Sequence, residues 1–122
     1  MKKINRVKKS YEFDNILKSG RVVKDKFFVI YYKNNELDRY RFGISVGKKI
    51  GNAVCRNKFK RQIRNIVDKN KKYYQNNMDY IIILRKASLE VEFDTLKRSF
   101  ENLIAKINQG TAHAKRDGSI AS

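Results

Sequence analysis

The sequence contains too few cysteines for an internal disulfide bond, because Cys55 is the only cysteine among its 122 residues. A chain without disulfides fits a reducing compartment, so we expect a cytoplasmic protein. No apolar run approaches the roughly 18 residues that a membrane-spanning helix requires. The basic N-terminus is not followed by the apolar segment of a signal peptide. These absences argue against a secreted, disulfide-stabilised domain and against a membrane protein.

Acidic residues are also scarce: 12 Asp and Glu stand against 29 Lys and Arg, which leaves a net charge of +17. Such an excess predicts a polyanionic partner, either nucleic acid or an anionic membrane. The hydrophobic fraction of 41%, together with periodic apolar segments, argues against disorder. A chain of this length predicts one domain with a modest core.

Residues that could give the protein a catalytic site of its own are dispersed along the chain. Helix dipoles and solvated turns account for most of the acidic residues. His113, the single histidine, lies in the C-terminal tail, and we do not expect it to act as a metal ligand or general base. Cys55 lies at the start of a basic helix, where thiolates are stabilised, but without a partner histidine it is better explained as a packed side chain. We therefore predict no catalytic residues, and whether any side chain contacts a metal is unknown.

The first half of the sequence predicts one helix and two strands. A short helix is expected over about residues 11–19, with Ser10 as its N-cap and Gly20 as its stop. Residues 26–32 are β-branched and aromatic, which is typical of a strand. Residues 39–47 alternate, and one of their faces carries Gly43, Ser45 and Gly47. Such small side chains would let a helix, another backbone or an RNA strand approach closely.

The second half predicts a helix, a strand and a helix. The first helix begins after Gly51-Asn52 and runs to about Lys72. Residues 78–84 form a continuous apolar run of strand length, so we expect a central strand covered on both faces. A regular amphipathic helix follows over about residues 91–108. Gly110 is expected to end it, and residues 110–122 are interpreted as a disordered tail or an expression remnant.

The helix after Gly51-Asn52 concentrates positive charge on a folded surface. Between Lys48 and Lys72 there are ten Lys or Arg residues and one acid, Asp68, while apolar residues keep helical spacing toward a core. Ordinary solvated helix faces mix Lys with Glu, which this helix lacks. The pattern therefore favours RNA or DNA contact over a plain solvated face. The candidate residues are Arg56, Asn57, Lys58, Lys60, Arg61 and Arg64.

Aromatic residues suggest a second surface. Phe13 on the first helix, with Phe27 and Tyr31 on the next strand, could line a groove in which unpaired bases stack. Their spacing alone also suits ordinary core residues.

The motif of residues 48–54, Lys-Lys-Ile-Gly-Asn-Ala-Val, is followed by Arg56-Asn57-Lys58 and further basic residues one turn on. This stretch resembles the protein subunit of bacterial ribonuclease P, and the resemblance extends over about residues 3–108. It implies an α/β (α+β) two-layer sandwich, with a four-stranded mixed sheet and three helices. It also implies a left-handed βαβ crossover through the basic helix. Residues 1–109 would form this domain.

The same resemblance implies a function. The family's protein assists a large catalytic RNA, which binds the Mg²⁺ needed for phosphodiester cleavage. The protein binds this RNA and also the 5′ leader of precursor tRNA, in a cleft between the first helix and the sheet. No small-molecule substrate is implied. The implied RNA-binding residues are Lys48, Lys49, Asn52, Arg56, Asn57, Lys58, Lys60, Arg61 and Arg64, and the implied leader-cleft residues are Phe13, Leu17, Phe27 and Tyr31.

Two positions depart from the family pattern. Lys58 replaces an arginine and so loses the planar fork that binds phosphate bidentately. Leu17 stands where the family often has a second aromatic residue. Two other interpretations remain open from the residues alone: a ribosomal or RNA-chaperone protein without a role in cleavage, and a nuclease that acts by itself.

Overall fold

The computed structural model describes the backbone of residues 5–120 and the side chains of residues 5–110. Short 3-10 turns at Lys48–Ile50, Lys71–Tyr73 and Lys86–Glu90 join the longer elements. The longer elements are, in order, α1 (Ser10–Ser19), β1 (Arg21–Lys24), β2 (Phe28–Asn34), β3 (Arg41–Ser45), α2 (Ala53–Lys69), β4 (Met78–Leu84) and α3 (Phe93–Ile120).

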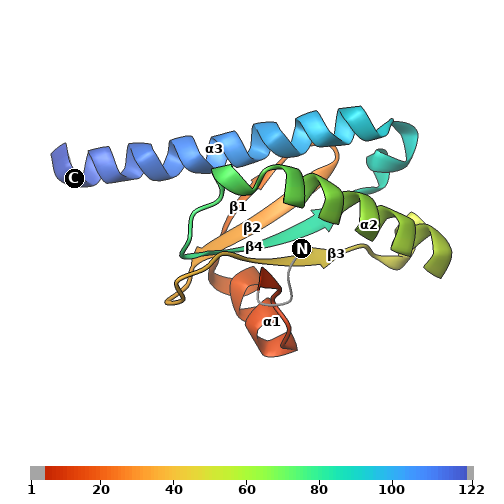
Figure 1. Cartoon of the computed structure of the whole chain (residues 1–122), viewed down its shortest axis with the longest axis horizontal. Coiled ribbons are helices and arrows are strands. Elements are labelled where there is room, and N and C mark those ends of the chain that lie inside the picture. Colours follow the sequence, from red (N-terminus) through yellow and green to blue (C-terminus); the bar gives the residue numbers. More distant parts are fainter. Residues whose placement is uncertain (1–4, 121–122) are drawn as a thin grey trace.

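The four strands form one mixed sheet in the order β1-β2-β4-β3. β2 is antiparallel to β1 and β4, whereas β3 and β4 are parallel neighbours connected through α2. Helices α2 and α3 cover one face of the sheet, and α1 lies against part of the other (Figure 1). This arrangement confirms the predicted four-stranded mixed sheet with three helices and the βαβ connection. The left-handed sense of that crossover stays a prediction.

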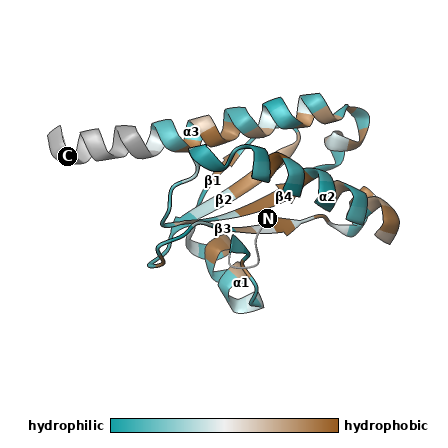
Figure 2. Cartoon of the chain, in the orientation of Figure 1, coloured by the Kyte–Doolittle hydropathy of each residue, from teal (hydrophilic) through white to brown (hydrophobic). Residues whose placement is uncertain are grey.

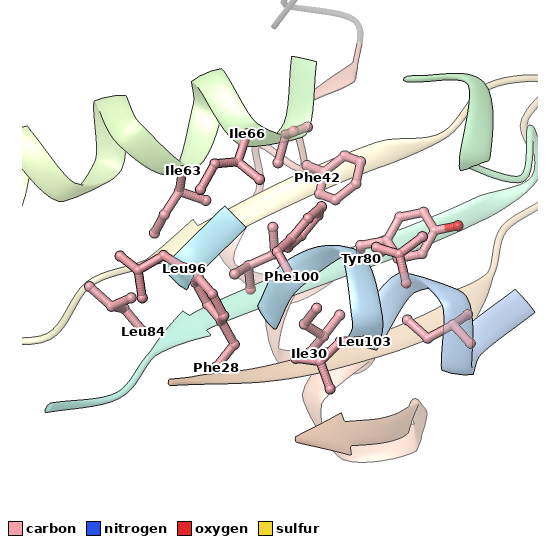
Figure 3. Packing of buried hydrophobic residues seen from close by; sticks show 14 of the residues in the cluster. Phe28, Ile30, Phe42, Ile63, Ile66, Tyr80, Leu84, Leu96, Phe100 and Leu103 are labelled. Carbon is pink, nitrogen blue, oxygen red and sulfur yellow. The ribbon is translucent and has the colours of Figure 1, made fainter. Parts of the chain in front are cut away.

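The core lies between the sheet and the layer formed by α2 and α3 (Figure 3). Ile63 and Ile66 of α2 and Phe100 of α3 are at most 1% exposed and pack toward the strands. β4 is central, and six of its seven residues are buried, as its continuous apolar run predicts. The stripe of α2 that faces this core fixes the rotation of the helix, so its other side is left to solvent.

Two buried tyrosines at one end of the core make stability sensitive to alkaline pH. Burial raises the pKa of Tyr80 to about 12, and burial also raises the pKa of Tyr74. Above about pH 10 an unfolded chain loses these protons while the folded chain keeps them, so the free energy of unfolding falls as pH rises. Tyr80→Phe should make the loss between pH 9 and 11 about 1.4 kcal/mol smaller. Urea unfolding of both proteins at the two pH values measures this, and equal losses would contradict it.

Several predicted boundaries of the first half need correction. The N-cap of α1 is Lys9, and it has no side-chain hydrogen bond, so Ser10 is the first helical residue and not the cap. Both predicted strands are displaced or shorter, because β2 begins at Phe28 and β3 spans only Arg41–Ser45. The periodicity did not indicate β1 at all. That strand has four residues and lies mostly exposed at the sheet edge, so no alternation marks it.

The last helix does not stop at Gly110, because α3 continues to Ile120. A glycine inside a helix costs only about 1 kcal/mol relative to alanine, and no proline follows to end the helix. The helical backbone therefore extends past the predicted boundary at residue 109. The assignment of residues 110–122 to a separate segment stays a prediction, and residues 121–122 lie outside the described part. Within that part, no helix is long and apolar enough to cross a membrane.

Candidate RNA-binding surface

The start of α2 is fixed by a side-chain cap. Asn52 accepts a hydrogen bond from the backbone N–H of Cys55 (Oδ1···N 2.9 Å). Gly51 has φ 151°, and a Cβ there would lie 3.1 Å from Cys55, so glycine is favoured by both conformation and space. The side chain of Asn52 is thus engaged in capping, which leaves its amide N–H groups for the predicted RNA contact.

The cations of α2 face away from the core. Asn57, Lys58 and Arg61 are exposed, while Arg56, Lys60 and Arg64 are half-buried; we call these six residues the basic face. The hydropathy colouring shows α2 as largely hydrophilic (Figure 2). Among the described residues, none of these five cations forms an ion pair with a carboxylate. The predicted charged surface is therefore present and is not neutralised by the described part of the chain.

Two arginines have unsatisfied donors. The Nε atoms of Arg6 and Arg56 are buried and, among the described residues, have no hydrogen-bond partner. A buried donor without a partner costs about 1–3 kcal/mol. Each of these atoms therefore lacks the hydrogen bond that would offset its burial.

The second face of the sheet carries a row of register neighbours. Val22 on β1 pairs with Tyr31 on β2, Tyr31 with Ile81 on β4, and Ile81 with Gly43 on β3. Because directly opposed residues share a face, all four lie on the side that carries α1. Ile81 is fully buried, Tyr31 half-buried, and Val22 48% exposed. Part of this face is therefore open beside α1.

Helix α1 approaches the sheet through Phe13. A Cβ added at Gly43 would lie 2.5 Å from Phe13 Cε2 and 2.7 Å from Ile81 Cδ1. The aromatic ring of Phe13 thus occupies the space left by Gly43. This agrees with the expectation that the small residues of this strand let a helix approach closely. Phe13 and Tyr31 consequently stand on either side of Ile81 on the same face of the sheet.

A hollow of about 170 Å³ joins this aromatic face to the basic face. We call it the edge hollow, because β3 is an edge strand and contributes three of its lining residues. The residues that line it are Arg6, Val7, Phe13, Phe42, Gly43, Ile44, Lys60 and Arg64. Phe13 of the predicted leader cleft and two cations of the basic face therefore meet at one site.

Other predicted site residues lie outside the edge hollow. Leu17, one helical turn after Phe13, is half-buried. Lys48 and Lys49 are exposed in the turn before α2. Phe27 packs against the core cluster, and its backbone oxygen accepts hydrogen bonds from Arg85 and Ser88. The structure thus does not bring Phe27 to Phe13, because Phe27 precedes β2 and turns toward the core.

Residues that the sequence pattern missed support the same site. Val7 donates a backbone hydrogen bond to Phe42 (2.9 Å), which holds the N-terminal segment along β3 and places Arg6 in the edge hollow. Arg41 forms ion pairs with Glu12 and Asp79. Of these residues, only Arg6, which belongs to the basic N-terminus, carried a signal in the sequence.

The described residues contain no group of three or more His, Cys, Asp and Glu that could hold a metal ion. Cys55 packs against the core cluster, as expected of a small side chain. The side chain of His113 lies outside the described residues.

An α+β domain in which a basic helix face, without carboxylate partners among the described residues, meets an open aromatic sheet face has the features of a small RNA-binding protein. The Ribonuclease P family model matches residues 1–108. The chain is 46% identical over 108 residues to the ribonuclease P protein component of Mycoplasma capricolum, covering 88% of this chain and 99% of that protein. The chain belongs to the ribonuclease P protein family.

Solved structures of this family share the fold. A ribonuclease P protein from Thermotoga maritima superposes with a TM-score of 0.77 at 33% identity, covering 83% of this chain and 96% of that one. A Staphylococcus aureus ribonuclease P protein mutant, described as having defective mRNA degradation activity, gives a TM-score of 0.81 at 38% identity, covering 87% and 90%.

Family membership establishes the general role. The chain is a protein subunit of the ribonuclease P endoribonuclease, which acts in tRNA 5′ processing, and its partner is the ribonuclease P RNA. The alternative of a ribosomal or RNA-chaperone protein is not favoured.

Proposed function

We propose that this subunit holds two RNAs on adjacent surfaces: the ribonuclease P RNA on the basic face and the 5′ leader of precursor tRNA beside Phe13 and Tyr31. The observation that carries this proposal is the edge hollow, where Phe13 of α1 meets Lys60 and Arg64 of α2. Single-stranded RNA is held by aromatic rings that stack on bases and cations that contact the backbone. The edge hollow offers both within one site.

The basic face supplies the affinity for the larger RNA. Its cations have no carboxylate partners among the described residues, so phosphates can displace loosely held counterions from them without breaking internal ion pairs. Asn57 adds a group that both donates and accepts hydrogen bonds. Lys58 contributes charge, although it cannot make the bidentate contact of an arginine.

Catalysis is assigned to the RNA partner. We assign Mg²⁺ mainly to that RNA as well, since the described protein residues do not offer a carboxylate or histidine cluster for a metal. On this proposal the protein binds and orients precursor tRNA. Because mature tRNA lacks the leader, the holoenzyme then binds precursor tRNA in preference to mature tRNA. We expect the complex to work in the cytoplasm.

Reconstitution tests the proposal. Precursor tRNA is incubated at limiting Mg²⁺ with the ribonuclease P RNA, with the protein, and with both. We expect cleavage by the RNA to accelerate when the protein is added, and the protein to tighten binding of precursor tRNA but not of mature tRNA. We expect the gain in cleavage rate to be large at low Mg²⁺, because the Lys and Arg side chains of the protein reduce the repulsion between the two RNAs.

Two outcomes would overturn the proposal. No gain in rate or precursor affinity would leave only a general RNA-binding role. Cleavage of precursor tRNA by the protein without RNA would indicate a nuclease that acts by itself.

A further inference from the structure

Helix α1 is tied to the sheet by a partly buried chain of charges. The guanidinium of Arg41 on β3 lies between two carboxylates: its Nη1 is 2.9 Å from Glu12 Oε2 on α1, and its Nε and Nη2 are 2.9 and 2.8 Å from the two oxygens of Asp79 on β4. The Arg41 side chain is 11% exposed. The Glu12 link is therefore a direct connection between α1 and the strands.

The far end of this chain is rigidly held. Asp79 is 5% exposed, and its Oδ1 also accepts a hydrogen bond from Asn35 Nδ2 at 2.7 Å. Asn35 in turn donates to the backbone oxygen of Arg39. With the bidentate contact to Asp79 formed, the planar guanidinium has one orientation. The position of its Nη1, which donates to Glu12, is then fixed as well. The hydrogen bonds to Asp79 and Glu12 raise the pKa of Arg41, so the guanidinium stays charged.

This chain is adjacent to Phe13 on both elements. Glu12 immediately precedes Phe13 on α1, and Arg41 stands two residues before Gly43 on the same face of β3. Arg41 and Gly43 are therefore about 6.6 Å apart along the strand. The ion pair holds Glu12 of α1 at Arg41 of β3. The ring contact holds the next residue of α1, Phe13, at Gly43 of the same strand. One contact alone would let the helix roll about its axis, whereas two contacts fix its rotation.

We propose that Glu12, Arg41 and Asp79 are positioning residues that set the rotation of α1 and thereby hold the Phe13 ring at the edge hollow for single-stranded RNA. The inference rests on the proposed function of the edge hollow. Buried ion pairs generally contribute little net stability compared with apolar residues of similar size. A directional role explains their presence at this point of the fold.

The test compares precursor and mature tRNA binding by the reconstituted holoenzyme carrying Glu12→Ala, Glu12→Gln or Glu101→Ala. Glu12→Ala should lower the preference for precursor tRNA about three- to tenfold, less than the full worth of one charged hydrogen bond, because Glu12 is 28% exposed and acts on the RNA only through the Phe13 ring. Glu12→Gln keeps an oxygen that can accept from Arg41 Nη1, so it should restore most of the preference. Glu101→Ala, which removes an exposed carboxylate paired with Lys97 at 3.9 Å, makes the same change in net charge and should have no effect on the preference.

A double-mutant cycle distinguishes positioning from general stability. In a Phe13→Ala background, adding Glu12→Ala should cause no further loss of precursor preference, because the ring that Glu12 positions is gone. Glu12→Asp serves if Glu12→Ala folds poorly: it keeps the charge but is one methylene short, and it should give an intermediate preference.

The outcomes separate the two proposals. A wild-type holoenzyme that binds precursor and mature tRNA equally would overturn the proposed function itself. A wild type that prefers precursor, together with Glu12→Ala and Glu12→Asp variants that keep the full preference, would overturn only the positioning role. Additive losses in the Phe13→Ala cycle would do the same.

Discussion

Replacing Arg61 and Arg64 with alanine is expected to weaken binding of the ribonuclease P RNA roughly 10- to 100-fold near physiological salt, and to flatten its salt dependence. Arg61 is exposed and Arg64 is half-buried at the edge hollow, and neither has a carboxylate partner among the described residues. Each phosphate contact that is lost lowers the slope of log K against log salt by about 0.7 to 0.9. Binding titrations over a series of salt concentrations measure both quantities.

The control for this prediction keeps the net charge the same. Arg98 and Lys106 are exposed on α3, so replacing both with alanine also removes two positive charges. We expect this pair to reduce affinity only slightly and to leave the slope unchanged. If both pairs had equal effects, net charge alone would explain RNA binding, and the basic face would have no special role.

Gly43→Ala should destabilise the protein by about 1–3 kcal/mol, as overpacking of a close contact does. The new Cβ would lie 2.5 Å from a Phe13 ring carbon and 2.7 Å from Ile81 Cδ1, so the Phe13 ring, or α1 with it, must shift away from the sheet. We expect precursor tRNA affinity to fall with it, while affinity for the ribonuclease P RNA stays nearly constant. Thermal or urea unfolding measures the first effect, and binding assays measure the others.

Gly47→Ala is the matched control, because no atom lies within 4 Å of a Cβ at Gly47. Its φ of −77° suits any residue, so the substitution should change stability by less than about 0.5 kcal/mol. Adding Phe13→Ala to Gly43→Ala should recover part of the lost stability by removing the ring that clashes. A Gly43→Ala protein as stable as wild type would mean that α1 is not held against this part of the sheet.

Elements with strong local signals could be predicted from the sequence. The start of α2 at Asn52 and its apolar stripe are encoded within a few residues, and α2 ends at Lys69, three residues before the predicted end. The continuous apolar run of β4 also indicated its central position correctly. The basic face follows from the same helical spacing, since the side that faces the core determines the side that faces solvent.

Features that depend on distant residues could not be predicted from spacing. The partners of Arg41 lie 29 and 38 residues away, and nothing local marks Glu12 or Asp79 as those partners. β1 is short and exposed, so its assignment comes from pairing with β2 and not from its own pattern. Phe27 illustrates the converse: its aromatic type suggested a cleft residue, whereas its partly buried side chain packs against the core cluster.

Among the described residues the cations of the basic face have no carboxylate partners, and this has a consequence for the abundance of the subunit. Like charges spaced three or four residues apart on a helix repel one another, and a bound RNA relieves this repulsion. Ligands that bind only the folded state stabilise it by mass action. Unassembled copies are therefore the form most exposed to unfolding and proteolysis, so the supply of RNA would limit how much of the protein a cell retains.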